Sequence, residues 1–181
     1  MRYLIHLVAF ACLVGAVGDH HPVTAPEYSI KAVFLYNLIK YTEWPSLPAR
    51  ADPTGAIVLA VIGDDPFGNT LDQAVQDRTV RGRHIVVARF AGAKDIKPCH
   101  VAFVSGSDSA RLTELIHILT AQSVLVVGDS KETARAGAAV NFFMEQGKLR
   151  FDVNSPSTQR SHIELSSQLL KLARRVVESG N

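Results

Sequence analysis

Two adjacent aspartates form an acidic pair at a place where ligands commonly bind. Asp64 and Asp65 stand in the segment Gly63–Gly68, directly after the apolar run Ile57–Ile62. We expect that run to be a buried strand, and ligands of open α/β sheets bind at the carboxyl ends of such strands. Adjacent carboxylates there could hold a divalent cation. The segment is therefore a candidate ligand loop, with Asp64, Asp65 and Phe67 as its side chains.

Two known uses of such a loop are not supported by the surrounding sequence. A receiver domain would also need an aspartate after the third strand and a lysine after the fifth. Here these strands lead into Ser105-Gly106 and Met144-Glu145. The G-x-G-x-x-G pattern of dinucleotide-binding proteins is also missing. The structural alternative is that Asp64 or Asp65 caps the following helix, and we favour it.

The residues that could act as nucleophiles or metal ligands show no catalytic pattern. Ser130 follows an apolar run, but no G-x-S-x-G segment surrounds it, so we expect it to cap a helix. Cys99 and His100 are neighbours on an expected strand, so their side chains should point to opposite faces. The histidine spacings contain no zinc motif. We therefore expect no enzymatic activity, no metal and no cofactor.

The start of the chain predicts export. Met1–Arg2 supplies a positive charge, Tyr3–Val17 is almost continuously apolar, and small residues precede Asp19. This run is too short to span a membrane and is typical of a cleaved signal peptide. A buried N-terminal helix is the alternative, and Cys12 raises a lipoprotein alternative that Phe10 fits poorly. The predicted organisation is a signal peptide at 1–18, a tail at 19–26 and one domain at 27–181.

Composition limits the remaining classes of protein. The chain has 181 residues, of which 47% are hydrophobic and 20% are charged, as in ordinary globular proteins. Its net charge of +2 comes with no run of basic residues, so we expect no nucleic-acid partner. The sequence contains no second apolar run of about 20 residues, so we do not expect a polytopic membrane protein. Once the signal peptide is removed, Cys99 is the remaining cysteine, and we expect it to be buried beside Val101–Val104.

A helix is expected at Glu27–Tyr41, and it is apolar on more than one face. Its main stripe contains Ile30, Val33, Phe34, Asn37, Leu38 and Tyr41. Leu35, Tyr36 and Ile39 add apolar surface away from that stripe. Such a helix must be buried both in its own core and against a partner. We therefore predict that Leu35, Tyr36 and Ile39 contact a binding partner.

The rest of the chain alternates apolar runs rich in valine and isoleucine with helical patterns. This alternation predicts an α/β fold with a mainly parallel sheet of about six strands, helices on both faces and a C-terminal antiparallel hairpin. A free edge strand at 148–153 would be a second partner surface, with Asp152 as a charge at its rim. The expected strands are 57–62, 85–90, 101–104, 124–127, 139–144 and 148–153, and the expected helices are 72–75, 107–122, 133–136, one starting at 155–156, and 166–178.

Five segments together resemble the YfiR family of periplasmic proteins. They occur in order and cover nearly the whole chain after the signal peptide. The segments are Glu27–Asn37 leading into Tyr41–Pro45, Gly63–Gly68, Cys99–Phe103, Leu149–Asn154 and Ser166–Ala173.

The resemblance implies a periplasmic regulator without catalytic activity. Members of this family bind the periplasmic sensing domain of an inner-membrane diguanylate cyclase of YfiN type and hold the enzyme inactive. An outer-membrane peptidoglycan-binding lipoprotein of YfiB type sequesters the regulator and releases the cyclase. Cyclic-di-GMP and biofilm formation are then downstream of the regulator. The resemblance does not decide whether the protein forms a homodimer. The alternative function is a periplasmic small-molecule-binding sensor that uses the loop at Asp64–Gly68.

The sequence departs from the family pattern at two points. Family members that are stabilised by disulfides carry further cysteines, whereas Cys99 stands alone here and cannot pair within one chain. His162 occupies a position where the family pattern predicts glycine. The backbone turn before Ile163 is therefore a point for the structure to test.

Overall fold

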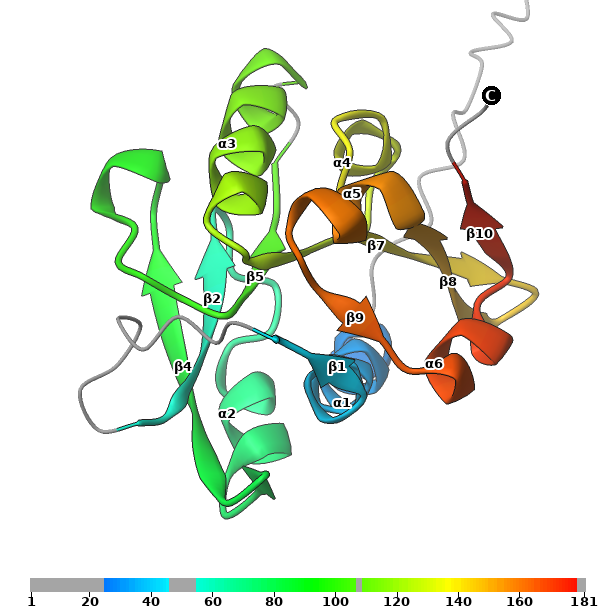
Figure 1. The fold of residues 1–181 in the computed structure, drawn as a ribbon. Coiled ribbons are helices and arrows are strands. Elements are labelled where there is room, and N and C mark those ends of the chain that lie inside the picture. The colour runs from blue at the N-terminus through cyan, green and yellow to red at the C-terminus, as the bar shows by residue number, and fades with distance from the viewer. Residues whose placement is uncertain (1–24, 46–54, 107–108, 179–181) are drawn as a thin grey trace, which may run out of the picture.

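The computed structural model describes residues 25–45, 55–106 and 109–178, and their main feature is a mixed eight-stranded sheet (Figure 1). The strand order is β10-β8-β7-β6-β5-β2-β4-β3. The five strands from β7 to β4 run parallel, β8 is antiparallel to β7, and β3 is antiparallel to β4. The strands are β2 Ile57–Ile62, β3 Thr79–Val80, β4 Arg83–Phe90, β5 Val101–Val104, β6 Leu125–Gly128, β7 Val140–Glu145, β8 Lys148–Asn154 and β10 Arg175–Val177.

Helices pack on both faces of this sheet and create two separate apolar cores. One core joins α1 and α2 to one face of the strands, and the other joins α3 to the opposite face. Successive residues of β2 alternate between them, because neighbouring side chains on a strand point to opposite faces. The helices are α1 Ala25–Lys40, α2 Asn69–Val75, α3 Ser109–Ala121, α4 Lys131–Arg135, α5 Ser155–Arg160 and α6 Ser167–Leu172, with a short 3-10 turn, η1, at Ala93–Asp95.

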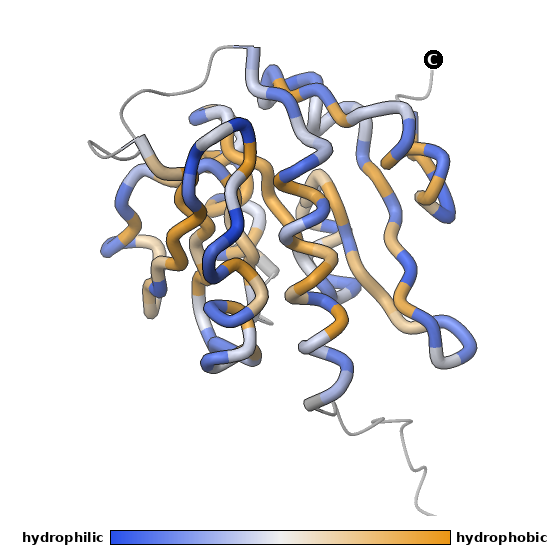
Figure 2. The backbone as a smooth tube through the Cα atoms, turned by 90° about the horizontal axis from the view of Figure 1, so that it is seen from below, coloured by the Kyte–Doolittle hydropathy of each residue, from blue (hydrophilic) through white to orange (hydrophobic). Residues whose placement is uncertain are grey.

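The inner strands confirm the expectation that both of their faces are covered. Every residue of β2, β5 and β6 is buried, which is the burial that continuous runs of valine and isoleucine predict for parallel strands. Figure 2 shows the same distribution, with hydrophobic positions concentrated along the inner strands and hydrophilic positions in the outer turns. The predicted α/β fold with a mainly parallel sheet and a C-terminal antiparallel pair is therefore confirmed.

The C-terminal region differs from the sequence-based expectation. The helix expected at 166–178 ends at Leu172, and Arg175–Val177 instead forms β10, which pairs in parallel with Asp152–Asn154 of β8. Together with β3, which the sequence analysis also did not predict, β10 brings the main sheet in the described part of the chain to eight strands rather than about six. The expectation of a free edge at 148–153 is wrong over its last residues, because β10 covers them.

A second small sheet fixes the end of α1. Its strands are β1 Thr42–Glu43 and β9 Glu164–Leu165, which pair antiparallel. The turn that leads into β9 contains His162 with φ of 52°, in the left-handed region that glycine adopts most readily. The turn therefore forms although histidine occupies the position where the family pattern predicts glycine.

Candidate functional site

The candidate ligand loop is anchored by Phe67, whose side chain is buried in the core. Its ring packs edge-on against Tyr28 of α1 and Phe103 of β5, with centroid distances of 5.1 Å and 4.8 Å. Such edge-to-face pairs add to the free energy gained by burying the rings. Of the three side chains proposed for this loop, Phe67 therefore has a structural position between α1 and the sheet.

The two aspartates of the loop have different surroundings. Asp65 accepts a hydrogen bond from the backbone N–H of Phe67 at 2.8 Å and pairs with Arg89 of β4 at 2.6 Å. Arg89 also pairs with Asp72 of α2, and these two carboxylates raise the pKa of its guanidinium. Asp64 is exposed to solvent.

The expected cap of α2 by one of these aspartates is wrong. Gly68 is the N-cap residue of α2, and no side chain caps the helix. Asp65 lies three residues before Gly68. Its carboxylate instead accepts hydrogen bonds from the Phe67 N–H and from Arg89. Asp65 therefore ties the loop to β4, and Asp64 is the carboxylate of this loop that points into solvent.

A buried ion-pair cluster joins α1 to the end of β6. Lys31 is only 3% exposed, and its Nζ atom lies 2.7 Å from Asp129 and 2.6 Å from Glu27. The hydroxyl of Tyr28 donates to the same Asp129 carboxylate at 2.9 Å, and the ammonium group lies 4.3 Å from the Tyr28 ring centroid. Burial and the neighbouring Asp129 raise the pKa of Tyr28. A buried charge needs such partners because its desolvation is costly.

Sequence reasoning missed this cluster. Hydrophobic periodicity assigns a lysine to the solvent side of a helix, so it gave no reason to bury Lys31. Asp129 belongs to no motif that the sequence analysis identifies. The weak signal was its position directly after a buried strand, where a carboxylate can meet a residue from a covering helix.

The burial of Lys31 changes which face of α1 points outward. Leu35 and Ile39 have 0% exposed area, so the expected exposure of these two side chains is wrong. Ile30 and Val33, which were expected to point inward, are 42% and 43% exposed. The inward face contains Lys31 with its ion-pair partner Asp129, so it differs from the face that the apolar stripe alone predicts.

Tyr36 is half-buried, and the guanidinium of Arg78 lies 4.5 Å from its ring centroid. The contact with Arg78 covers part of the ring, while the rest stays accessible. Among the three residues of α1 proposed for partner binding, Tyr36 is therefore the one that remains at the surface.

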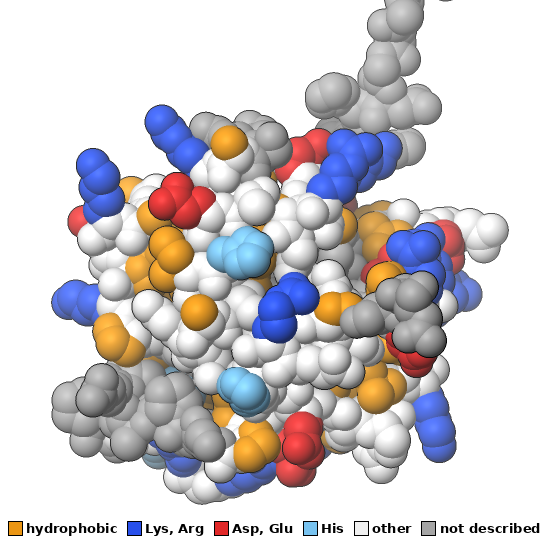
Figure 3. Space-filling view, turned by 45° about the horizontal axis from the view of Figure 1, so that its top comes forward, with side chains coloured by type: hydrophobic (Ala, Val, Ile, Leu, Met, Phe, Trp, Pro, Cys, Tyr) orange, Lys and Arg blue, Asp and Glu red, His pale blue; other side chains and the backbone are white. Residues whose placement is uncertain are grey.

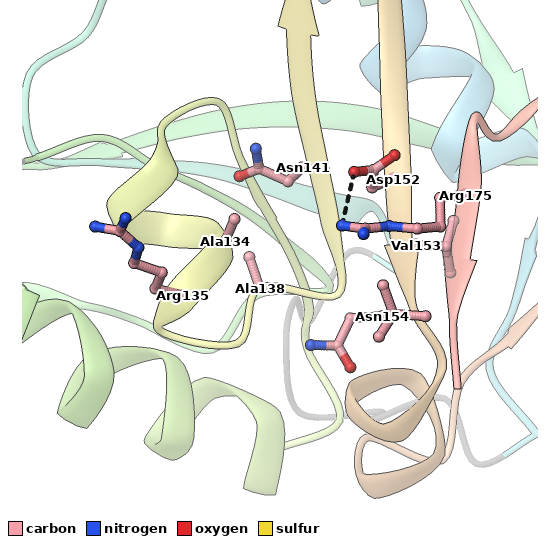
Figure 4. A pocket seen from close by; sticks show the side chains of 9 residues that line it. Ala134, Arg135, Ala138, Asn141, Asp152, Val153, Asn154 and Arg175 are labelled. Carbon is pink, nitrogen blue, oxygen red and sulfur yellow. Dashed lines mark hydrogen bonds and ion pairs between the residues drawn. The ribbon is translucent and has the colours of Figure 1, made fainter. Parts of the chain in front are cut away.

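Asp152 lies on β8 and holds the start of β10. Arg174 donates two hydrogen bonds to its carboxylate, at 3.0 Å and 2.6 Å, and Arg175 lies 3.5 Å away. Figure 4 shows Arg175 reaching across from β10 to Asp152 at the edge of a cavity of about 320 Å³. Asn141, Asn154 and Ala138 also line this cavity. The charge proposed for the rim of a partner surface is thus already paired with arginines of its own chain.

The remaining reactive residues have the structural positions that the sequence predicted. Cys99 is buried, and this burial raises the pKa of its thiol to about 12. Cys99 belongs to the core beneath α3, whereas His100 accepts a hydrogen bond from Val58 N–H and contacts Trp44 on the other side. Ser130 caps α4 by accepting from the backbone N–H of Thr133 at 3.0 Å.

No group of three His, Cys, Asp or Glu side chains within the described residues is placed to hold a metal ion, and none of their helices is long and apolar enough to cross a membrane. Figure 3 views the molecule from the side of α3, α4 and α5, where side chains of both charges lie among separate hydrophobic ones.

These observations define an α/β sandwich. The ion pairs of Asp65, Asp129 and Asp152 have a structural role, because each joins two segments of the fold. A family model described as YfiR/HmsC-like matches residues 28–174, and the chain belongs to this family. Proteins of this family are periplasmic regulators of cyclic-di-GMP signalling rather than enzymes, and they act with a diguanylate cyclase. The signal peptide expected at 1–18 lies outside the described residues.

One comparison with a solved structure supports the fold. A conserved domain protein from Vibrio cholerae matches with a TM-score of 0.55 and 10% identity, over 81% of this chain and 60% of that one. The ABC domain in complex with L-Trp from Streptococcus pneumoniae matches with a TM-score of 0.48 and 9% identity, over 71% of this chain and 58% of that one. This chain thus spans about three fifths of either structure. Comparison with curated proteins found no match.

Proposed function

We propose that this protein binds the periplasmic sensing domain of an inner-membrane diguanylate cyclase of YfiN type and represses the enzyme. The observation that carries the proposal is the family match, which extends over residues 28–174 and therefore includes most of α1, every strand of the main sheet except β10, and β9. An outer-membrane peptidoglycan-binding lipoprotein of YfiB type relieves the repression by sequestering the regulator.

We place the cyclase-binding surface on the outward face of α1. Ile30 and Val33 are exposed there about one helical turn apart, and half-buried Tyr36 follows Val33 by three residues, so each side chain neighbours the next along the helix surface. Exposed apolar and aromatic side chains of this kind anchor protein interfaces. This surface replaces Leu35 and Ile39, which are in the core.

The remaining contacts of α1 suit it to a role in binding. Lys31 and Leu35 hold the opposite face of the helix against the sheet through ion pairs and apolar packing. A helix that is already ordered loses little conformational entropy when it meets a partner. Asp152 is paired with Arg174 and Arg175, so we give it a structural role in this scheme.

Site-specific photo-crosslinking tests the proposal directly. A photoreactive amino acid at Val33 should give a crosslinked product with the sensing domain of the cyclase, identified by mass spectrometry. Ile118 of α3 is the matched control, because it is 47% exposed but lies on the opposite side of the sheet. Equal crosslinking from positions 33 and 118, or none from position 33, would contradict the proposed surface.

A further inference from the structure

A second cavity lies at the carboxyl ends of the central strands, away from the proposed cyclase-binding surface. It measures about 340 Å³ and is bordered by the segments that follow β4, β2 and β5 and by the first turns of α3. Its lining includes Ile62, Ser105, Gly106, Arg111, Leu112 and Leu115.

The cavity lies where the connections from two neighbouring strands lead in opposite directions. Strand β4, which follows β2 in the chain, pairs with one edge of β2, and β5 pairs with the other edge. The helices that follow β2 and β5, namely α2 and α3, cover opposite faces of the sheet. The carboxyl ends of β2 and β5 therefore form a topological switch point, and this is where open α/β sheets bind their ligands.

The floor of the cavity is held in place by the backbone. Ser105 N–H donates to the carbonyl of Ile62, and Gly63 N–H donates to the carbonyl of Phe90, both at 2.9 Å. Gly63 has φ of 92°, and a Cβ atom at this residue would lie 2.3 Å from the Ser105 carbonyl oxygen. The strand ends therefore approach closely here and leave a preformed hollow above them.

The side chains around the cavity set the chemistry of its ligand. Ile62, Leu112 and Leu115 are buried core residues whose edges form an apolar wall. Among the described residues that line the cavity, Arg111 is the charged one, and Ser105 adds a hydroxyl. An arginine recognises an oxyanion through charge-assisted hydrogen bonds. A volume of this size is at the lower end of the range of about 300–1,000 Å³ that is typical of small-molecule sites.

We propose that this cavity binds a small organic anion, with its acid group at Arg111 and its apolar part against Leu112 and Leu115. The proposal goes beyond the binding of the cyclase, because it would make the regulator responsive to a metabolite. It differs from the ligand loop at Asp64–Gly68, since the cavity opens on the side of α3. It does not depend on the proposed function, so either can fail without the other.

The test uses 3-phenylpropionate as the probe and follows the backbone amide signals of the complete domain by NMR. The neutral analogue 3-phenylpropionamide has the same apolar part, and inorganic phosphate has the charge alone. We expect shifts at the amides of Gly92, Ser105 and Gly106, and affinity for the carboxylate at least about tenfold higher than for either control compound.

Two variants complete the test. Arg111→Gln should weaken binding of 3-phenylpropionate by about tenfold, because it removes the charge-assisted hydrogen bonds. Arg135→Gln, an exposed arginine of α4 beside the other cavity, should leave binding unchanged. The proposal is overturned if Arg111→Gln binds as well as the parent protein. It is also overturned if the amide or phosphate binds equally well, or if millimolar probe shifts none of these three amides.

Discussion

Lys31 is buried, although lysine side chains on helices normally point into solvent. Its ammonium group is almost completely buried, and Asp129 and Glu27 supply the opposite charges. The cluster connects the beginning of α1 to the end of β6, which lie 98 residues apart in the chain. It therefore determines where α1 sits on the sheet and which of its faces reaches solvent.

Asp129→Ala should destabilise the protein by about 3 kcal/mol, because it leaves the buried Lys31 charge with reduced compensation. Urea unfolding monitored by the fluorescence of Trp44, the single tryptophan, measures this change. The double variant Lys31→Met with Asp129→Ala should recover much of the loss, since no buried charge is left at either position. A stability of Asp129→Ala equal to that of the parent protein would show that the cluster is energetically unimportant.

The Cys99 thiol provides a prediction about pH. Its pKa is raised by burial from an ordinary value of about 9 to about 12, so the folded state holds its proton more strongly than the unfolded state does. The resulting stabilisation is complete below pH 9 and is lost as the pH rises from 9 to 12. Stability should therefore fall more steeply over this range in the parent protein than in Cys99→Ala.

Thiol labelling gives an independent check of Cys99. The reagent should react slowly with the folded protein at pH 8 and rapidly after unfolding in urea. Fast labelling of the folded protein, or equal pH slopes for the parent and Cys99→Ala, would contradict the buried, protonated thiol.

His162 offers a stabilising substitution. Because its φ of 52° lies in the left-handed region, His162→Gly should raise the free energy of unfolding by up to about 1 kcal/mol. His84→Gly on the extended strand β4 is the control and should lower stability, since glycine weakens a strand. Thermal unfolding of both variants measures the difference, and a destabilised His162→Gly would mean that its side chain matters more than its backbone conformation.

At the scale of the element, α1 has two faces with different tasks. Val33→Glu changes the exposed face and should leave the stability of the domain within about 0.5 kcal/mol of the parent. Leu35→Glu places a charge in the core and should cost at least about 3 kcal/mol. Circular dichroism during urea unfolding distinguishes the two variants. Equal stabilities would contradict the orientation of α1 described here.

The inner strands could be predicted from the sequence because their signal is local. β2 and β5 are continuous apolar runs between turn residues, and the structure has them at the expected residues. The caps of α4 and α5 by Ser130 and Asn154 are equally local, and α5 starts at residue 155, where the sequence predicts a helix start. Elements of this kind depend on residues a few positions apart, so the sequence contains the necessary information.

The last segment and the orientation of α1 could not be predicted, because both depend on contacts between distant residues. Val176 and Val177 fit a helical stripe as well as a strand, and pairing with Val153 and Asn154 of β8 decides the outcome. Likewise, only the position of Asp129 in space explains why Lys31 is buried. Of the three α1 residues proposed from the sequence for partner binding, Leu35 and Ile39 are therefore buried and Tyr36 stays at the surface, and the role of α1 in binding remains a prediction.

At the scale of the whole molecule, the two proposed sites lie on opposite sides of the sheet. The outward face of α1 belongs to the helix layer over one core, whereas the cavity at Arg111 borders the other core. Ile62 reaches the cavity from β2, and the neighbouring Val61 packs in the core beneath α1. Strand β2 therefore borders the cavity with one of its faces and the core beneath α1 with the other.

The central claim is that the chain represses a diguanylate cyclase through the exposed face of α1. The most direct test is the cellular level of cyclic-di-GMP, measured in a strain without this protein and after complementation with the parent chain or with Val33→Glu. We predict that the level rises without the protein, returns to normal with the parent chain and stays high with Val33→Glu, although this variant is folded and present at the normal amount. An unchanged level of cyclic-di-GMP in the strain without the protein would contradict the claim.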